Sequence, residues 1–288
     1  MRPNVFLFPN DCFNPKQPDA AYGDRYSAFK RAGFKTALIE IESLDKEETK
    51  VYPALSPNDV VVYIGWMLSA TDYQFLTRIV EKTGAACFTS STEYLATHYL
   101  PNWYPLIADL TPETKIFSTT DNLELQLQQL NWSQYFIKDY VKSLKTSIGA
   151  IIDRPTQINE VLAEMKKYRG VIEGGVCVRR VEDFITETEE RYFVINGEPF
   201  ASEGDYAHST QGVQSPFGTL ARSAVTLRDR NIPDIVNHCA SRINSNFFSI
   251  DVVQRKDGVL RIVEIGDGQV SDLVGWSIER CIQIWQSK

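Results

Sequence analysis

Apolar and polar residues alternate along the first hundred positions in a pattern that predicts strands and helices in turn. The apolar strand-like runs and the segments with helical spacing follow one another at 4–9, 24–34, 36–42, 59–66, 73–84 and 85–89. Runs as continuously apolar as VVVYI indicate strands that are covered on both faces, which favours a parallel sheet with crossover helices. We therefore expect a small α/β layer.

The pattern changes after TPET at 111–114, and we place a domain boundary near residue 110. The segments that follow are predicted as helix 121–130, strand 135–140, helix 158–170, β-rich runs within 176–204, a hairpin at 249–272 and a last helix over 271–285. This order of elements is typical of an α+β arrangement rather than of a second alternating layer.

The closing hairpin carries one carboxylate inside each of its apolar strands. SIDVVQ and VLRIVEI flank the turn RKDG, and this register would place Asp251 opposite Ile262, with Glu264 diagonal to Asp251 on the same face. A bulge would change that parity. Two carboxylates at such a distance repel each other unless a cation lies between them, and Mg²⁺ prefers oxygen ligands. The alternative is a polar stripe that faces solvent.

A lysine also lies inside an apolar strand. Lys138 in FIKDY would cost desolvation energy unless a partner compensates its charge, and a strand lysine that faces a cleft can bind a phosphate. The segment that follows adds Lys142 and Lys145, which could contact more of a polyphosphate. The alternative is a surface loop with solvated lysines.

Further charges lie in RRVEDFITETEERYFV. Glu182, Glu189 and Arg191 could bracket a nucleotide, or Glu182 and Arg191 could form a cross-strand salt bridge. The long polar segment 201–223 is of the kind that closes over a site, as is 139–149.

Composition narrows the function classes. Lys and Arg total 30 against 37 Asp and Glu, and the net charge of -7 argues against general binding to nucleic acid or to anionic membranes. The five cysteines are scattered, which fits buried thiols in a reducing compartment better than zinc or disulfides. No run is long enough for a signal peptide or a membrane span, so we expect a cytoplasmic protein.

In order and spacing, these groups resemble the ATP-grasp enzymes over roughly residues 110 to 275. That family makes acylphosphates from carboxylates and ATP and joins them to amines. The resemblance implies that Lys138, Lys142 and Lys145 contact the phosphates, that Glu182, Asp183, Phe184 and Ile185 meet the adenine, that Glu189 binds the ribose, and that Arg191 and Lys145 serve the transferred phosphoryl group. Asp251 and Glu264 match the metal hairpin, with Asp267 or water as a third ligand.

The resemblance also implies a fold and a reaction. A pre-ATP-grasp α/β domain would occupy 1–110, followed by an α+β ATP-grasp domain at 111–288 whose two subdomains, 111–180 and 181–288, carry the phosphate loop and the metal site. STEYLATHYLPNWYP and LTPET look closest to a poorly characterised clade of predicted amide-forming ATP-grasp proteins of bacteria and phages. The implied function is an ATP- and magnesium-dependent ligase that joins small-molecule or peptide carboxylates and amines.

The sequence departs from the family pattern in three respects. Gly266 stands where the metal motif usually has Asn, the phosphate loop lacks the common glycine run, and His98 is nearest to the place of an earlier phosphate-binding lysine. These departures keep two alternatives open. One is an ATP-binding sensor or scaffold with reduced catalysis, and the other is a small-molecule kinase.

Overall fold

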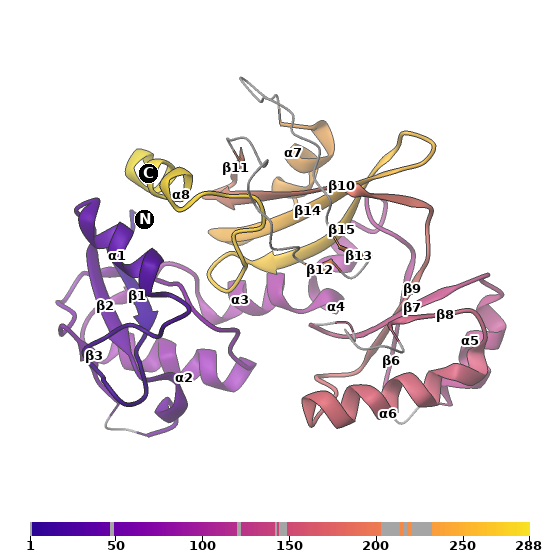
Figure 1. Ribbon diagram of the computed structural model, residues 1–288, viewed down its shortest axis with the longest axis horizontal. Coiled ribbons are helices and arrows are strands. Elements are labelled where there is room, and N and C mark those ends of the chain that lie inside the picture. The colour runs from indigo at the N-terminus through magenta and orange to yellow at the C-terminus, as the bar shows by residue number, and fades with distance from the viewer. Residues whose placement is uncertain are drawn as a thin grey trace.

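The structure is a computed structural model. It describes residues 2–46, 49–119, 122–141, 143, 149–202, 214–215, 218–219 and 232–288. The described part contains three larger β-sheets (Figure 1). Within it, no helix has the length and apolarity that a membrane crossing requires.

The first sheet has the strand order β3-β2-β1-β4-β5. Its strands are β1 (Val5–Pro9), β2 (Lys35–Ile39), β3 (Val51–Tyr52), β4 (Val60–Tyr63) and β5 (Ala86–Cys87). All neighbours are parallel except β3, which joins the β2 edge in the antiparallel direction. The helices of this unit are α1 (Gly23–Arg31) and α2 (Ala70–Glu81), with a 3₁₀ turn η1 (Ile41–Ser43). The predicted α/β layer is confirmed.

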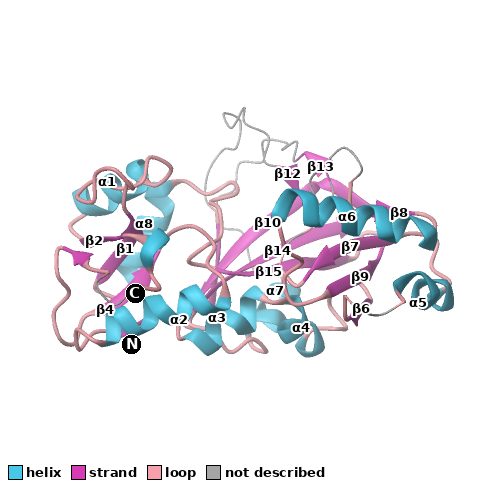
Figure 2. Cartoon of the chain, turned by 90° about the horizontal axis from the view of Figure 1, so that it is seen from below, coloured by secondary structure: helices cyan, strands magenta, loops and turns pink. Residues whose placement is uncertain are grey.

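Short helices lead from the first sheet to the rest of the chain. They are α3 (Ser91–His98), α4 (Leu100–Trp103) and the 3₁₀ turn η2 (Tyr104–Leu106). α3 begins with a capping box, in which Ser90 and Glu93 satisfy each other's backbone N–H groups. α2, α3 and α4 follow one another along one side of the molecule (Figure 2).

The second sheet has the order β6-β9-β7-β8 and is antiparallel. Its strands are β6 (Thr114–Phe117), β7 (Tyr135–Asp139), β8 (Ile151–Ile152) and β9 (Val176–Arg180). The helices α5 (Leu123–Leu130) and α6 (Ile158–Arg169), the latter preceded by η3 (Pro155–Gln157), share a core with β7 and β9. These helices cover one face of the sheet. Lys138 of β7 instead forms an ion pair with Glu264, a residue near the C-terminal end of the chain.

The third sheet has the order β11-β10-β14-β15 and is also antiparallel. Its strands are β10 (Phe184–Ile195), β11 (Glu198–Ala201), β14 (Phe247–Arg255) and β15 (Leu260–Asp267), and α7 (Asp234–Ala240) packs beside them. A separate hairpin is formed by β12 (Gln214–Ser215) and β13 (Gly218–Thr219). Together these sheets confirm an N-terminal α/β unit followed by an α+β arrangement, and the domain boundaries stay predictions.

The C-terminal helix α8 (Ile278–Ser287) connects the first and third sheets. The Trp285 ring of α8 lies 5.3 Å from the Phe6 ring of β1 and 5.0 Å from the Phe247 ring of β14, measured between centroids. All three side chains are buried. A single apolar core therefore runs from the N-terminal layer into the third sheet.

Two predicted elements differ in the structure. The β-rich run that begins at 176 is divided, because the chain leaves the second sheet after Arg180 and enters the third at Phe184. The last helix begins at Ile278 rather than at 271: Ser277 caps it, and Gly275 with φ 75° interrupts the turn before it. The loop that results lies beside the candidate site.

Candidate active site

Three charged side chains form a row across the third sheet. Arg191 on β10 pairs in register with Asp251 on β14, and Asp251 pairs with Glu264 on β15. The expected pairing of Asp251 with Ile262 is wrong, because the next pair is Val252 with Ile262 and one extra residue of β15 is accommodated there. This bulge places the two carboxylates directly opposite each other.

Basic residues flank the two carboxylates on both sides. The Arg191 guanidinium donates two hydrogen bonds, of 2.7 and 2.6 Å, to the two oxygens of Asp251. From the second sheet, Lys138 Nζ donates to Glu264 Oε1 at 2.9 Å. The side chains therefore follow the order Lys138, Glu264, Asp251, Arg191, with two adjacent carboxylates between two cations, and we call this set the charged row. The structure brings together four predicted site residues from four strands.

The pKa values of the two carboxyl groups move in opposite directions. Burial raises the pKa of Asp251, and the neighbouring Glu264 adds to this against the opposing effect of Arg191. Burial would also raise the pKa of Glu264, but the charge and hydrogen bond of Lys138, together with the charges of Arg191 and Arg179, outweigh it, and the pKa is lowered. The pKa of Arg191 is raised, because the attraction of Asp251 and other acids exceeds the effect of burial.

A buried arginine that the sequence analysis missed supports the bulge. Arg179 of β9 is 2% exposed and donates hydrogen bonds to the carbonyl of Val263, the extra residue, and to Thr111 Oγ1. Thr111 in turn donates to the carbonyl of Ile262 at 2.7 Å. Like Lys138, Arg179 is a charge inside an apolar strand, so the criterion that singled out Lys138 could have found it.

The donor set of the charged row fits a magnesium ion that arrives with phosphate oxygens. Mg²⁺ is usually bound by one or two carboxylates together with waters and substrate phosphates. Asp251 and Glu264 supply two adjacent carboxylates, and their mutual repulsion is what a divalent cation would relieve. In the described part of the chain, no cluster of three or more His, Cys, Asp or Glu residues exists to hold an ion without other ligands.

The structure does not bring Asp267 together with Asp251 and Glu264. Side chains alternate along a strand, so Asp267 lies on the opposite face of β15 from Glu264. Its Oδ1 accepts hydrogen bonds from the backbone N–H and the side-chain amide of Gln269, at 3.0 and 3.1 Å. Burial raises the pKa of Asp267 to about 8. The side chain is placed as a structural group rather than as a third ligand.

Two hydroxyl groups stand beside Gly266, where the family pattern has Asn. Ser249 Oγ and Ser271 Oγ lie 2.8 Å apart, and a Cβ at Gly266 would be 3.2 and 3.1 Å from them. A side chain at this position would have to displace the hydroxyl pair. Gly266 therefore leaves room for the two hydroxyl groups.

The remaining predicted residues lie elsewhere. The carboxylate of Glu182 binds Arg255 and Arg261, at 3.3 and 3.1 Å, so the alternative of a salt bridge between Glu182 and Arg191 is wrong. Other predicted residues line the start of β10: Phe184 and Ile185 pair with β14, Asp183 accepts a backbone hydrogen bond from Lys256, and Glu189 is buried where the β10–β14 register shifts. Lys142, Lys145 and most of the segment 201–223 lie outside the described residues.

Solved structures of similar fold cover the whole chain. They include D-cycloserine synthetase DcsG, with a TM-score of 0.62, 12% identity and coverage of 98% of this chain and 99% of that one. The ATP-grasp ligase PsnB in complex with a minimal precursor gives a TM-score of 0.60, 11% identity and coverage of 100% and 99%. D-alanyl-alanine synthetase A from Vibrio cholerae gives 0.59, 12%, 100% and 98%. At these identities the likeness shows the fold.

Comparison with protein-family models identifies the part of the chain that contains the charged row. No curated protein sequence matches the chain. The family model described as ATP-grasp domain, R2K clade family 3, matches residues 129–286, which is more than half of the chain and includes every member of the charged row. The protein therefore belongs to the ATP-grasp domain family, R2K clade family 3.

Proposed function

We propose that the protein is an ATP- and magnesium-dependent carboxylate–amine ligase that acts through an acylphosphate. The observation that carries this proposal is the charged row, in which Lys138 of one sheet meets the acidic pair of another. Full burial of Lys138 and Asp251 and partial burial of Arg191 and Glu264 cost free energy, and a site that must compensate a triphosphate and a cation offsets that cost when the ligands are bound. The ATP-dependent ligases among the structures of similar fold support the same reaction class.

The groups of the charged row suit phosphoryl transfer. A carboxylate oxygen of the acid substrate attacks the γ-phosphorus, and the bond from that phosphorus to the leaving oxygen of ADP breaks. Lys138 and Arg191 compensate the negative charge on the moving phosphoryl group, and Asp251 and Glu264 would hold Mg²⁺, which supplies charge neutralisation of the phosphates. The amine then attacks the acyl carbon, phosphate leaves, and the nitrogen loses a proton.

The residues that contact the remaining parts of ATP are also part of the proposal. We assign phosphate contacts to Lys142 and Lys145, adenine contacts to the segment 182–185 and the ribose to Glu189. Because Glu182 is engaged by two arginines, we assign the adenine contact to the backbone of this segment rather than to that carboxylate. Acylphosphates hydrolyse readily, so the reaction requires exclusion of water from the charged row.

Isotope transfer tests the proposal. The purified protein is incubated with ATP, Mg²⁺, an amine panel and an acid panel labelled with ¹⁸O in the carboxylate. Transfer of the label into phosphate, together with amide formation, is the expected result. ADP release with a phosphorylated hydroxyl product and no label in phosphate would identify a kinase instead.

A catalytically reduced ATP-binding sensor or scaffold is the second candidate. Gly266 favours it, because this residue has no side chain to supply the further ligand that the family pattern has in Asn. The signature of this candidate is magnesium-dependent binding of ATP without ADP release over the same panels.

A further inference from the structure

The loop between β15 and α8 contacts both the side chain and the main chain of Arg191. The carbonyl of Asp272 accepts a hydrogen bond from Arg191 Nη1 at 2.8 Å, and Trp276 Nε1 donates to the carbonyl of Arg191 at 2.9 Å. Between these two contacts the loop makes a turn, in which the backbone N–H of Trp276 donates to the carbonyl of Leu273 at 2.7 Å. We call residues 272–276 the Arg191 loop.

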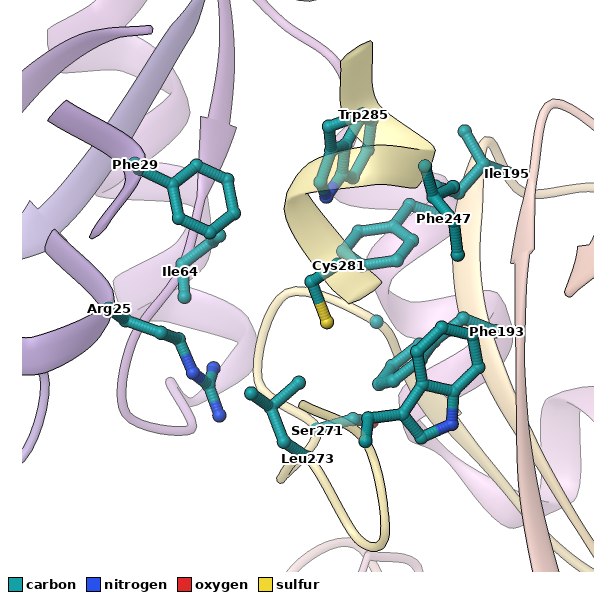
Figure 3. Close-up of a pocket in the computed structure, with 13 residues that line it drawn as sticks. Arg25, Phe29, Ile64, Phe193, Ile195, Phe247, Ser271, Leu273, Cys281 and Trp285 are labelled. Atoms are coloured by element: carbon teal, nitrogen blue, oxygen red, sulfur yellow. The ribbon is translucent and has the colours of Figure 1, made fainter. Parts of the chain in front are cut away.

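The core that joins the first and third sheets holds the Arg191 loop in place. Trp276 is 6% exposed, and its ring meets the Phe193 ring edge-on, with the centroids 5.0 Å apart. Leu273 packs against the same core, between Phe193 of β10 and Arg25 of α1 (Figure 3). Because close-packed side chains have little freedom to move, the loop presents its two contacts to Arg191 in a fixed position.

Trp276 takes the place of a strand neighbour at Arg191. β11 runs along β10 and ends at Ala201, which is paired with Tyr192, so this strand stops before it reaches Arg191. The indole of tryptophan has a single N–H donor and no acceptor. Its hydrogen bond to the Arg191 carbonyl therefore satisfies the buried indole and fixes the backbone of β10 at the residue that belongs to the charged row.

Contacts within the described part of the chain use three of the N–H donors of Arg191. Nε and Nη2 donate to the two oxygens of Asp251, and Nη1 donates to the carbonyl of Asp272. A guanidinium has five N–H groups in a rigid planar fork, so one donor on Nη1 and one on Nη2 are left for another ligand. Two donors on adjacent nitrogens match two oxygens of a phosphoryl group. The Arg191 side chain is 13% exposed, so part of it is accessible to such a ligand.

We propose that Trp276 is a positioning residue, which holds Arg191 so that its two remaining donors face the γ-phosphoryl group of ATP. The inference rests on the proposed function, which assigns Arg191 to that group. ADP lacks the γ-phosphoryl group, so these two donors gain no ligand when ADP binds. Trp276 therefore contributes to a preference for ATP over ADP by acting through Arg191.

Calorimetric titrations with a non-hydrolysable ATP analogue and with ADP, both in the presence of Mg²⁺, test the proposal. Trp276→Phe keeps an aromatic ring beside Phe193 and removes the N–H donor. We expect this variant to bind the ATP analogue about fivefold more weakly, which is the effect of one hydrogen bond, and to bind ADP as the wild type does. Trp132→Phe alters a ring beside Tyr135 in the second sheet, and this control should match the wild type for both nucleotides.

Further variants test whether Trp276 acts through Arg191. Arg191→Lys keeps the charge but cannot make the same forked contacts, so it should itself lower the preference for the ATP analogue over ADP. The double variant, Arg191→Lys with Trp276→Phe, should bind the ATP analogue no more weakly than Arg191→Lys alone, because the two residues act as a unit. Gly275→Ala strains a residue at φ 75° in the Arg191 loop, so it should lower the same preference while the indole is retained.

The outcomes separate the positioning role from the proposed function. The positioning role is overturned if Trp276→Phe weakens the ATP analogue and ADP equally, if the losses in the double variant add up, or if Trp276→Phe and Gly275→Ala both keep the preference of the wild type. In these cases the proposed function stands. If the wild type binds neither nucleotide, or if Arg191→Lys leaves the preference unchanged, the role of Arg191 in the proposed function fails and the positioning role fails with it.

Discussion

Replacing Arg179 should change the geometry of the candidate site while changing the free energy of unfolding only a little. Its guanidinium is almost fully buried and donates to Val263 and Thr111, which fixes the bulge that sets Glu264 opposite Asp251. The perturbation is Arg179→Met, which retains much of the side-chain volume and removes the charge and both hydrogen bonds. We expect the protein to remain folded and the acidic pair to lose its register.

The magnitude follows from two opposing effects. Burial lowers the pKa of Arg179 from 12.5 to about 10, which corresponds to about 3 kcal/mol against the charged form at ~1.4 kcal/mol per unit. Methionine relieves that cost. It leaves the carbonyl of Val263 without this donor, at about 1–3 kcal/mol, whereas the hydroxyl of Thr111 keeps its own hydrogen bond to Ile262. The free energy of unfolding should therefore change by no more than about 2–3 kcal/mol in either direction.

The assay compares urea denaturation with magnesium-dependent ATP binding. For Arg179→Met we expect a small change in the free energy of unfolding and a loss of at least about tenfold in ATP affinity at saturating Mg²⁺. Thr111→Val should act in the same direction, because it removes the second contact to the bulge, and the double variant should lose less than the sum of the two. Unchanged ATP affinity in Arg179→Met would refute the reasoning.

Two further predictions concern single charges. Lys138→Met should weaken ATP binding about tenfold or more and destabilise the protein, because it leaves Glu264 without its ion-pair partner, whereas Lys115→Met, which alters a half-exposed pair on β6, should do neither; calorimetry and thermal unfolding of both variants check this. Asp267 has a pKa of about 8 in the folded state and about 4 when unfolded, so the native state holds the extra proton between these values and stability should fall by up to ~1.4 kcal/mol per unit as pH rises through that window. Asp267→Asn should flatten that fall in urea denaturation from pH 5 to 8, and an unaltered slope would contradict it.

The sequence was informative wherever a charge interrupts an apolar strand. Lys138, Asp251 and Glu264 were found by this criterion, since buried charges require partners and partners tend to gather. The pattern also located most strands, because continuous or alternating apolar runs reflect which faces are covered. These features depend on local residues, so they can be read along the chain.

The bulge and the C-terminal loop could not be predicted in the same way. The bulge in β15 depends on Arg179 and Thr111, which lie about 85 and 150 positions earlier in the sequence and meet it only in the fold. Leu273 and Trp276 have helical spacing, but they are apolar because they pack into the core beside α1 and β10. Their apolar character reflects tertiary contacts and not a helix face.

The central claim is that the acidic pair binds the cation that accompanies ATP. Calorimetric titration of ATP at increasing Mg²⁺ concentrations, in the wild type and in Glu264→Ala, tests it most directly. The account predicts that Mg²⁺ strengthens ATP binding in the wild type and that this dependence disappears in Glu264→Ala, although the variant keeps its folded structure by circular dichroism. An equal dependence on Mg²⁺ in both proteins would contradict it.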